Sequence, residues 1–272
     1  DWLPGRIEEL YVQLHERNFI KREDVFLVQK WIKALLDVGY EFPKLSERRI
    51  KPFPLSNTIQ APRRDQVPEK CTGKVNRVLV TGINGMIGSH IAKELIKDPC
   101  RVVYGLVRVR GGLHNLVGAL DKIKIIYGDI TDARGMRKIV GDAMPHEIYH
   151  FAAQANNDFS SEYPYTTIDT SIQGTLNLLE AIRMHRLESF TKILVAGSST
   201  QYGETADTWQ GPIPETAPQK PVSIYGVSKK TTEDLVFQHQ RVYGIHAVVA
   251  RLFIHVASGG TELLALQNFC QQ

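Results

Sequence analysis

Apolar residues along this chain form short continuous runs that alternate with longer amphipathic segments from about residue 75 onward. The continuous runs are RVLVTG, RVVYGLVR, KIKIIYGD, EIYHFAA, TKILVAGSS and HAVVARLF. Runs that are apolar throughout are typical of strands in a parallel sheet that is buried on both faces. Helical periodicity is expected between them, at about 86–97, 133–140, 166–184 and 223–242. The alternation predicts a doubly wound α/β domain with a parallel sheet over residues 75–272.

The residues before this domain follow two other patterns. Over 1–42, apolar residues recur near a helical period and predict an N-terminal helical extension. The apolar positions of its clearest segment are Val25, Val28, Trp31, Ile32, Leu35 and Leu36. Such a face either packs on the main domain or docks a partner. Over 43–74, five prolines interrupt any helix and predict an extended connector.

Composition restricts the classes of partner. Hydrophobic residues make up 43% of the 272 residues, which is ordinary for a globular protein. The net charge of +4 comes from Lys and Arg residues that are scattered rather than clustered, so a nucleic-acid surface is not expected. No apolar run approaches the roughly 18 residues of a membrane span, so membrane insertion is not expected either.

The three cysteines, Cys71, Cys100 and Cys270, are far apart in sequence and form no C-x-x-C pair. This spacing favours neither a disulfide framework nor a metal site, and it indicates a reducing, cytoplasmic environment. Because the sequence begins with Asp1 rather than Met, an organelle interior after removal of a targeting peptide stays open as the alternative.

A glycine-rich turn joins the first predicted strand to the first predicted helix in VTGINGMIGSH. Glycines at this spacing allow a tight turn, a close approach of a pyrophosphate to the backbone, and close packing of the helix on the strand. The free N–H groups at the start of the helix favour phosphate as well. We therefore expect a Rossmann dinucleotide-binding turn made of Gly82, Gly85, Met86, Ile87 and Gly88.

The second strand ends in GLVRVRGG, which lacks the acidic residue that binds the ribose hydroxyls in NAD-dependent domains. Arg108 and Arg110 stand there instead, and a guanidinium pairs with a 2′-phosphate. NADP is therefore the expected cofactor and NAD the less favoured one, unless one of these arginines is simply solvated.

The segment SIYGVSKK places Tyr225 and Lys229 four residues apart on a predicted helix, so both side chains face the same way. A nearby ammonium favours the phenolate and lowers the pKa of a phenol, which would suit Tyr225 to acid–base work near neutral pH. The segment GSSTQYG after the fifth predicted strand supplies further hydroxyl groups, which could alternatively cap a turn.

The G-x-x-G-x-x-G spacing and the order of the later motifs resemble the extended short-chain dehydrogenase/reductase family. Within it, FAAQA, GTLNLLEAIR and ILVAGSSTQYGE are similar to the NAD(P)-dependent epimerase/dehydratase group that acts on nucleotide sugars, above all to GDP-mannose 4,6-dehydratases and GDP-4-keto-6-deoxymannose reductases. The resemblance covers about residues 76–260. It implies that Ser198, Tyr225 and Lys229 are catalytic, Ser198 because it lies four residues before a Tyr-Gly pair.

The resemblance also implies a set of cofactor contacts, made by Asp129, Ile130, Ala152, Ala153, Gln154, Tyr225 and Lys229. The aspartate and isoleucine would contact the adenine, and the two alanines and the glutamine would line the nicotinamide ribose. The structural alternative for YGDITD is that one of its aspartates caps the following helix.

Three features depart from the family pattern. Dehydratases of the group carry a Glu two residues before the Tyr-Gly pair, where this chain has Thr200, and a hydroxyl cannot take a proton as a carboxylate does. Ile254 stands where the family has an Asn that helps to hold the substrate. The chain ends at Gln272 whereas family members continue, so the resemblance implies a truncated or missing C-terminal substrate lobe.

Two functions follow from these observations. The first is an NAD(P)-dependent nucleotide-sugar enzyme, a dehydratase, 4-keto reductase or epimerase that transfers hydride at the sugar C4. The alternative is a catalytically weak or silent subunit that keeps a bound dinucleotide and docks into a larger assembly through its N-terminal helices. Family members often dimerise through the two long helices expected here at 166–184 and 223–242, so the resemblance implies a homodimer where the chain is not docked in a larger complex.

Overall fold

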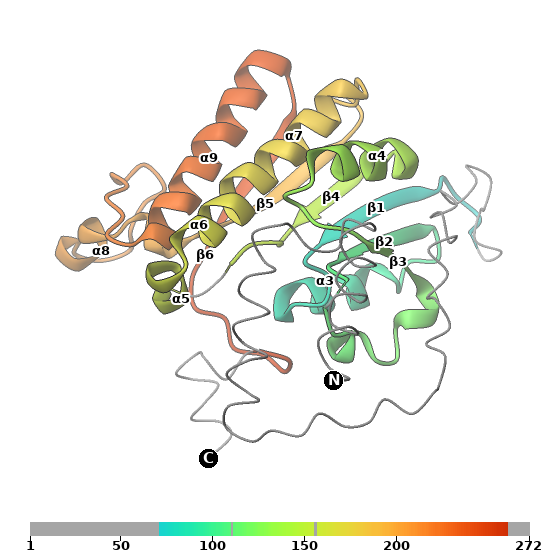
Figure 1. Ribbon diagram of the computed structural model, residues 1–272, viewed down its shortest axis with the longest axis horizontal. Coiled ribbons are helices and arrows are strands. Elements are labelled where there is room, and N and C mark those ends of the chain that lie inside the picture. The colour runs from blue at the N-terminus through green and yellow to red at the C-terminus, as the bar shows by residue number, and fades with distance from the viewer. Residues whose placement is uncertain (1–70, 110, 155–156, 261–272) are drawn as a thin grey trace, which may run out of the picture. The chain divides into compact units, whose positions relative to one another are not determined.

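Figure 1 shows the computed structural model of the chain, which describes residues 71–109, 111–154 and 157–260. The chain divides into two compact units, Asp1–Thr58 and Ile59–Gln272, and every described residue belongs to the second. The helical extension expected over 1–42, most of the expected connector, and Arg110 lie outside the described residues.

Six parallel strands form one sheet in the order β3-β2-β1-β4-β5-β6. The strands are β1 (Asn76–Thr81), β2 (Arg101–Val107), β3 (Ile123–Tyr127), β4 (Glu147–His150), β5 (Lys192–Ser198) and β6 (His246–Leu252). Each of the six apolar runs forms one of them, so the predicted doubly wound sheet is confirmed. The strand order reverses between β1 and β4, which is the place where open α/β sheets bind ligands.

Helices cover both faces of this sheet, with α4, α7 and α9 packed on one face and α3 on the other (Figure 1). The α-helices are α3 (Met86–Leu95), α4 (Ala133–Ala143), α5 (Asn157–Glu162), α6 (Pro164–Ile168), α7 (Gly174–Met184), α8 (Glu204–Thr208) and α9 (Ile224–Tyr243). The long helix expected at 166–184 is a run in which a π-helical segment, η3 (Asp169–Gln173), joins α6 to α7. Short 3₁₀ turns form η1 (His114–Leu116), η2 (Leu120–Lys122) and η4 (Ser199–Gln201). Within the described residues, no helix is both long and apolar enough to cross a membrane.

Two apolar cores explain why the strands contain so few polar residues. In β1, Leu79 points into the core shared with α4, α7 and α9, whereas Val78 and Val80 point into the core shared with α3. Successive side chains of a strand face opposite sides of the sheet, so a strand that is covered on both sides needs apolar residues at consecutive positions.

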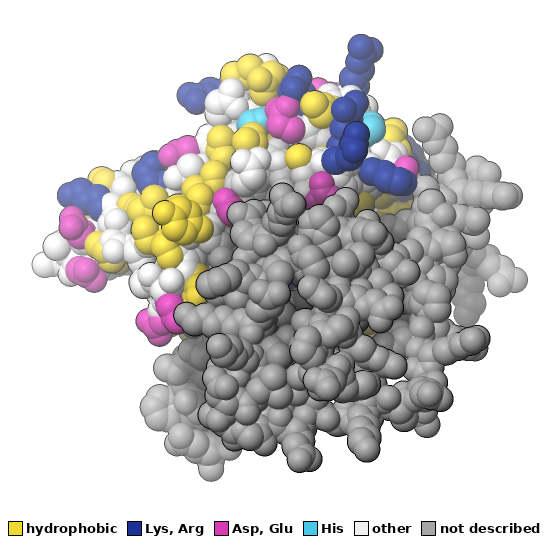
Figure 2. Space-filling view, viewed as in Figure 1, with side chains coloured by type: hydrophobic (Ala, Val, Ile, Leu, Met, Phe, Trp, Pro, Cys, Tyr) yellow, Lys and Arg dark blue, Asp and Glu magenta, His cyan; other side chains and the backbone are white. Residues whose placement is uncertain are grey.

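An apolar surface patch lies over α6 and the first turns of α9 (Figure 2). Its side chains are between 37% and 83% exposed and belong to Tyr163, Tyr165, Ile168, Ile224 and Val227. Contiguous apolar surface of this kind is typical of an interaction site. We refer to these five residues as the α6–α9 patch.

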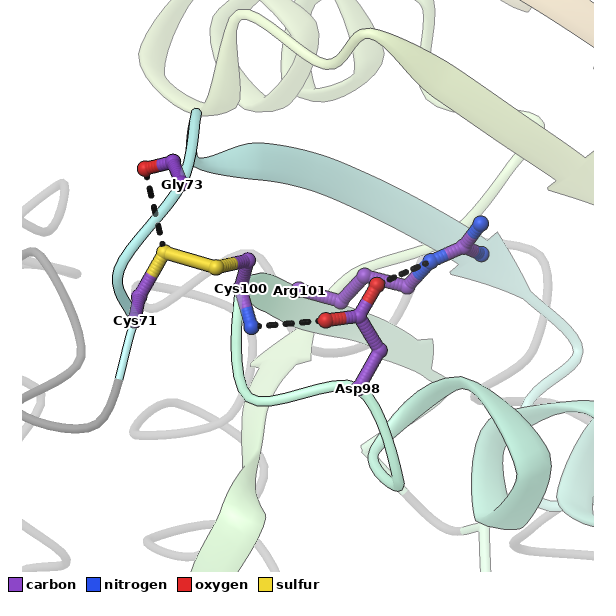
Figure 3. Close-up of a disulfide and its surroundings, with 5 residues drawn as sticks. All are labelled: Cys71, Gly73, Asp98, Cys100 and Arg101. Carbon is purple, nitrogen blue, oxygen red and sulfur yellow. Dashed lines mark hydrogen bonds and ion pairs between the residues drawn. A yellow bond between two sulfur atoms is a disulfide. The ribbon is translucent and has the colours of Figure 1, made fainter.

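A disulfide joins Cys71 to Cys100, although the spacing of the cysteines favoured no disulfide framework (Figure 3). Their Cα atoms are 4.7 Å apart although 29 residues separate them in sequence. The cause is the strand register, because Asn76 at the start of β1 pairs with Arg101 at the start of β2. The residues just before the two strands are thereby brought together. Next to the bond, the Asp98 carboxylate forms an ion pair of 3.4 Å with Arg101.

We expect the double substitution Cys71→Ser/Cys100→Ser to lower the free energy of unfolding by about 3–4 kcal/mol, because the bond closes a loop of about 30 residues in the unfolded chain. Urea unfolding of both proteins with and without a thiol reductant measures this. The unsubstituted protein should match the double variant once it is reduced, and a reductant-insensitive transition would contradict the prediction.

Candidate active site

The glycine turn lies at the end of β1, where the strand order reverses. Gly82 has φ of +67°, and a Cβ atom on it would come within 2.8 Å of the backbone nitrogen of Ala152 at the end of β4. A Cβ atom on Gly88 would lie 2.3 Å from the carbonyl oxygen of Gly82. Both positions therefore require glycine, one for the turn and one for the close approach of α3.

The first turn of α3 has the features of an anion site. Its N-cap is Gly85, which is exposed and provides no side-chain cap for the helix N–H groups. No acidic residue occupies the first turn, so the positive end of the helix dipole is not neutralised there. A pyrophosphate would supply both the missing acceptors and the negative charge.

Two asparagines that sequence reasoning missed tie loops to this turn. The Asn84 amide donates to the carbonyl of Gly112 at 3.0 Å. The Asn115 amide donates to the carbonyl of Asn84 at 3.0 Å and to that of Gly259, which follows β6, at 3.1 Å. The loop after β2 is thereby fixed against the glycine turn. Arg108 is exposed at the beginning of this loop.

The other expected cofactor contacts lie along the same edge of the sheet. The Asp129 carboxylate accepts hydrogen bonds from the backbone N–H and the hydroxyl of Thr131, at 2.9 and 2.8 Å, while Asp132 is the N-cap of α4. Ile130 is only 4% exposed, and its side chain lies against Gly174 in the core. Ala152, Ala153 and Gln154 follow β4 and are partly buried.

Ser198 and Tyr225 are brought together by β5 and α9. The Ser198 side chain is 7% exposed and lies close enough to the phenol of Tyr225 to oppose the rise in the phenol pKa that burial causes. The Ser198 hydroxyl oxygen also accepts from the backbone N–H of Thr200 at 3.2 Å and from the Thr200 hydroxyl at 2.8 Å. Both capping and contact with the tyrosine are therefore present, so the two interpretations of this serine are compatible.

A serine hydroxyl has one proton and two acceptor positions. The backbone N–H and the hydroxyl of Thr200 both lie within hydrogen-bond distance of the Ser198 oxygen, which leaves the serine proton available to the Tyr225 oxygen. This arrangement suits a group that gives a proton to, or takes one from, a bound hydroxyl or carbonyl.

Lys229 is buried next to this pair. Its side-chain nitrogen donates to the carbonyl of Ala196 at 2.6 Å and lies 5.9 Å from the centre of the Tyr225 ring. Burial lowers the pKa of the Lys229 ammonium to about 8. Burial also raises the pKa of the Tyr225 phenol, and the hydrogen bond from Ser198 opposes that increase. The lowering of the phenol pKa by Lys229 that the sequence predicted is thus not found in this structure.

A buried histidine, also missed from the sequence, connects the end of β1 to α7, and the charge of Lys229 acts on it. His150 is 3% exposed; its Nδ1 lies 2.7 Å from the Thr81 hydroxyl and its Nε2 lies 3.0 Å from the Thr175 hydroxyl. The Thr175 hydroxyl donates to the carbonyl of Ser171 at 2.6 Å, so it accepts the Nε2 proton of a neutral ring. Burial and the charge of Lys229 lower the pKa of His150 to about 3, which keeps the ring neutral. Its signal in the sequence was one polar residue inside the apolar run EIYHFAA.

Comparison with known proteins points to one family. The family model described as GDP-mannose 4,6 dehydratase matches residues 79–265. A GDP-mannose 4,6-dehydratase of Vibrio cholerae is 34% identical over 66% of this chain and 50% of its own length. GDP-mannose 4,6 dehydratase 2 of Arabidopsis thaliana is 33% identical over 74% of this chain and 55% of its own length. The chain spans about half the length of these curated relatives.

Solved structures show the same fold. The UDP-glucose 4-epimerase of Brucella ovis in complex with NAD is 28% identical, with a TM-score of 0.59 over 66% of this chain and 52% of that one. The dTDP-glucose 4,6-dehydratase DesIV of Streptomyces venezuelae, with NAD bound, is 25% identical, with a TM-score of 0.63 over 72% of this chain and 61% of that one. The fold is therefore that of the short-chain dehydrogenase/reductase epimerases and dehydratases. Within this class, the chain belongs to the GDP-mannose 4,6-dehydratase family, as its motifs indicated.

Stability should depend on pH through Lys229. The pKa of this ammonium is about 8 in the folded protein and about 10.4 in the unfolded chain, so the unfolded chain binds more protons between these values. Stability should therefore rise as the pH increases from about 8 toward 10, and Lys229→Met should lack this increase. Urea unfolding of both proteins across this range gives the difference in free energy, and two parallel curves would contradict the assignment.

Proposed function

We propose that the chain is the catalytic and dinucleotide-binding part of a nucleotide-sugar enzyme that exchanges hydride and a proton at the sugar C4. The observation that carries this proposal is the grouping of Ser198, Tyr225 and Lys229, with the Lys229 ammonium 5.9 Å from the centre of the Tyr225 ring and bonded to the carbonyl of Ala196 on β5. The family match and the names of the relatives support a nucleotide sugar as substrate, with GDP-sugars first.

The residues of the chain have distinct roles in this proposal. When bound, the dinucleotide supplies a hydride acceptor and donor. Tyr225 takes the proton of the C4 hydroxyl as a phenolate when that carbon is oxidised, and as a phenol it gives a proton when the carbonyl is reduced. Ser198 stabilises the phenolate by donating a hydrogen bond to it. We assign the buried ammonium of Lys229, which lies 5.9 Å from the centre of the Tyr225 ring, the role of holding a ribose hydroxyl.

Thr200 argues against elimination of water as the reaction. Dehydration needs a group that takes a proton from one carbon and gives one to the leaving hydroxyl, which a carboxyl performs. The Thr200 hydroxyl instead donates to Ser198 at 2.8 Å. We therefore favour C4 epimerisation or 4-keto reduction over dehydration, although the curated relatives named above are dehydratases.

A silent docking subunit is the second candidate. Ile254, in place of the family's substrate-binding Asn, is 81% exposed after β6 and offers no polar contact. Ser198 nevertheless lies close enough to Tyr225 to act on the pKa of its phenol, which favours activity over a scaffold role. For assembly we propose a homodimer, which the exposed apolar α6–α9 patch supports (Figure 2).

For the cofactor we propose NADP over NAD. Arg108 is exposed after β2, at the loop that Asn84 and Asn115 hold against the glycine turn. An arginine in this place pairs with a 2′-phosphate. The epimerase and dehydratase structures compared above contain NAD, so this preference has to be measured on the chain itself.

Arg108→Asp should weaken NADPH binding and narrow or reverse the preference over NADH, because a carboxylate repels a 2′-phosphate and accepts from a 2′-hydroxyl. Calorimetric titration of both dinucleotides measures the two affinities. Arg137→Asp, at an exposed position of α4, makes the same charge change and should leave the ratio unchanged. Equal or tighter binding of NADH by the unsubstituted protein would refute the NADP preference.

Tyr225→Phe should leave dinucleotide affinity near normal and remove turnover, because the ring still packs while the proton-transferring hydroxyl is gone. General acid–base groups contribute about 10²–10⁴-fold to rate. The assay supplies GDP-, UDP-, dTDP- and CDP-sugars and their 4-keto forms, and follows nicotinamide absorbance and product mass. Tyr243→Phe, on a tyrosine at the last position of α9 that is 40% exposed, is the matched control. Dinucleotide binding without turnover of any sugar by the unsubstituted, full natural protein would favour the docking subunit.

A further inference from the structure

A buried ion pair lies directly behind the Ser198 turn. Glu233 of α9 is 2% exposed, and both of its carboxylate oxygens accept hydrogen bonds from Arg251 of β6, at 2.9 Å from Nε and 2.5 Å from the terminal nitrogen. Arg251 also donates to the Tyr202 hydroxyl at 2.9 Å and to the carbonyl of Glu215 at 2.7 Å. The pair therefore connects α9, β6 and the segment that follows β5.

Gln201 carries this connection to Ser198. Its side chain is fully buried, its Oε1 accepts from the backbone N–H of Ser198 at 2.7 Å, and its Nε2 donates to Glu233 at 2.7 Å. The Gln201 amide also donates to the side chain of Gln219 at 3.1 Å, and Gln219 in turn donates to Glu233 at 2.8 Å. The backbone position of Ser198 is thus set by the carboxylate of Glu233 through one side chain.

The same carboxylate belongs to the helix that carries the phenol. Tyr225, Lys229 and Glu233 are spaced by four residues on α9, so they lie along one face of the helix. Near the start of α9, a Cβ atom on Gly226 would lie 2.7 Å from the carbonyl oxygen of Thr200, so helix and turn are in direct backbone contact. The separation between the Ser198 and Tyr225 hydroxyls therefore depends on how firmly α9 is bonded to this turn.

Glu233 has no free position from which to act as an acid or base. Its oxygens accept four hydrogen bonds, two from Arg251 and one each from Gln201 and Gln219. Burial alone would raise the pKa of this carboxyl, but the hydrogen bonds from Arg251, Gln201 and Gln219 hold it below its ordinary value. A carboxylate that accepts four hydrogen bonds and faces an arginine holds its neighbours in position and does not transfer protons.

We propose that Glu233 is a positioning residue that, held by Arg251 and acting through Gln201, sets the position of Ser198 relative to Tyr225. The expected effect on turnover rests on the proposed function, whereas the expected effect on the pKa of the Tyr225 phenol does not. Loss of the Ser198 hydrogen bond removes a group that favours the phenolate, so the phenol pKa should rise.

Gln201→Met is the sharpest test, because it removes the link to Ser198 and leaves the Glu233–Arg251 pair in place. A second variant, Glu233→Leu/Arg251→Met, removes the whole pair without leaving one charge buried alone. The phenol is followed by tyrosinate absorbance, as the difference between each protein and the same protein carrying Tyr225→Phe. We expect both variants to raise the Tyr225 pKa, and to lower kcat by about 100-fold at unchanged dinucleotide affinity, as misplacement of a reacting group does.

Glu180→Gln is the matched control, because Glu180 of α7 bonds His239 of α9 at 3.2 Å, away from the Ser198 turn. It should lower stability without moving the Tyr225 pKa or kcat. An unchanged Tyr225 pKa in a folded Gln201→Met protein would overturn the positioning role. A raised pKa in Gln201→Met, without turnover of any sugar by the unsubstituted protein, would refute the proposed function and support the positioning role.

Discussion

The parallel pairing of β1 with β4 is the constraint on which the rest of the site depends. It places Thr81 opposite His150 at the carboxyl ends of the two strands, beside the glycine turn. Because the sheet is buried on both faces, the polar groups that end up there have little access to water and must bond one another. The Thr81–His150–Thr175 chain meets that requirement and holds the ends of β1 and β4 together beside the turn at Gly82.

Two charged side chains are buried at the site, and they differ in how their charge is balanced. Lys229 is 5% exposed and donates to the uncharged carbonyl of Ala196 at 2.6 Å, so its ammonium is held at a cost that lowers its pKa. Glu233 is as deeply buried but is matched by Arg251, so its charge is retained. The Lys229 charge therefore lacks an ionic partner among the described residues, one that a ligand could supply, whereas the Glu233 charge is neutralised by Arg251 and holds the structure together.

The family relationship and the local chemistry lead to different expectations about the reaction. The family model carries the name of a dehydratase, whereas the hydroxyl chain from Thr200 through Ser198 to Tyr225 contains no carboxylate. A hydroxyl chain supports proton exchange with the oxygen of a bound ligand. A fold alone does not decide among dehydration, reduction and epimerisation, because the reaction depends on the side chains at the site.

The sequence alone determined the six strands, the glycine turn and the family, because each is encoded by local pattern and spacing. Apolar runs specify buried strands, and three glycines specify a turn whose geometry no other residue tolerates at Gly82 or Gly88. Only the tertiary structure decided the rest. The Cys71–Cys100 bond follows from the β1–β2 register, and the role of Gln201 and Glu233 follows from the packing of α9 on the turn after β5. The phenol pKa was predicted in the wrong direction because a spacing of four residues gives proximity, whereas burial depends on every element packed around Tyr225.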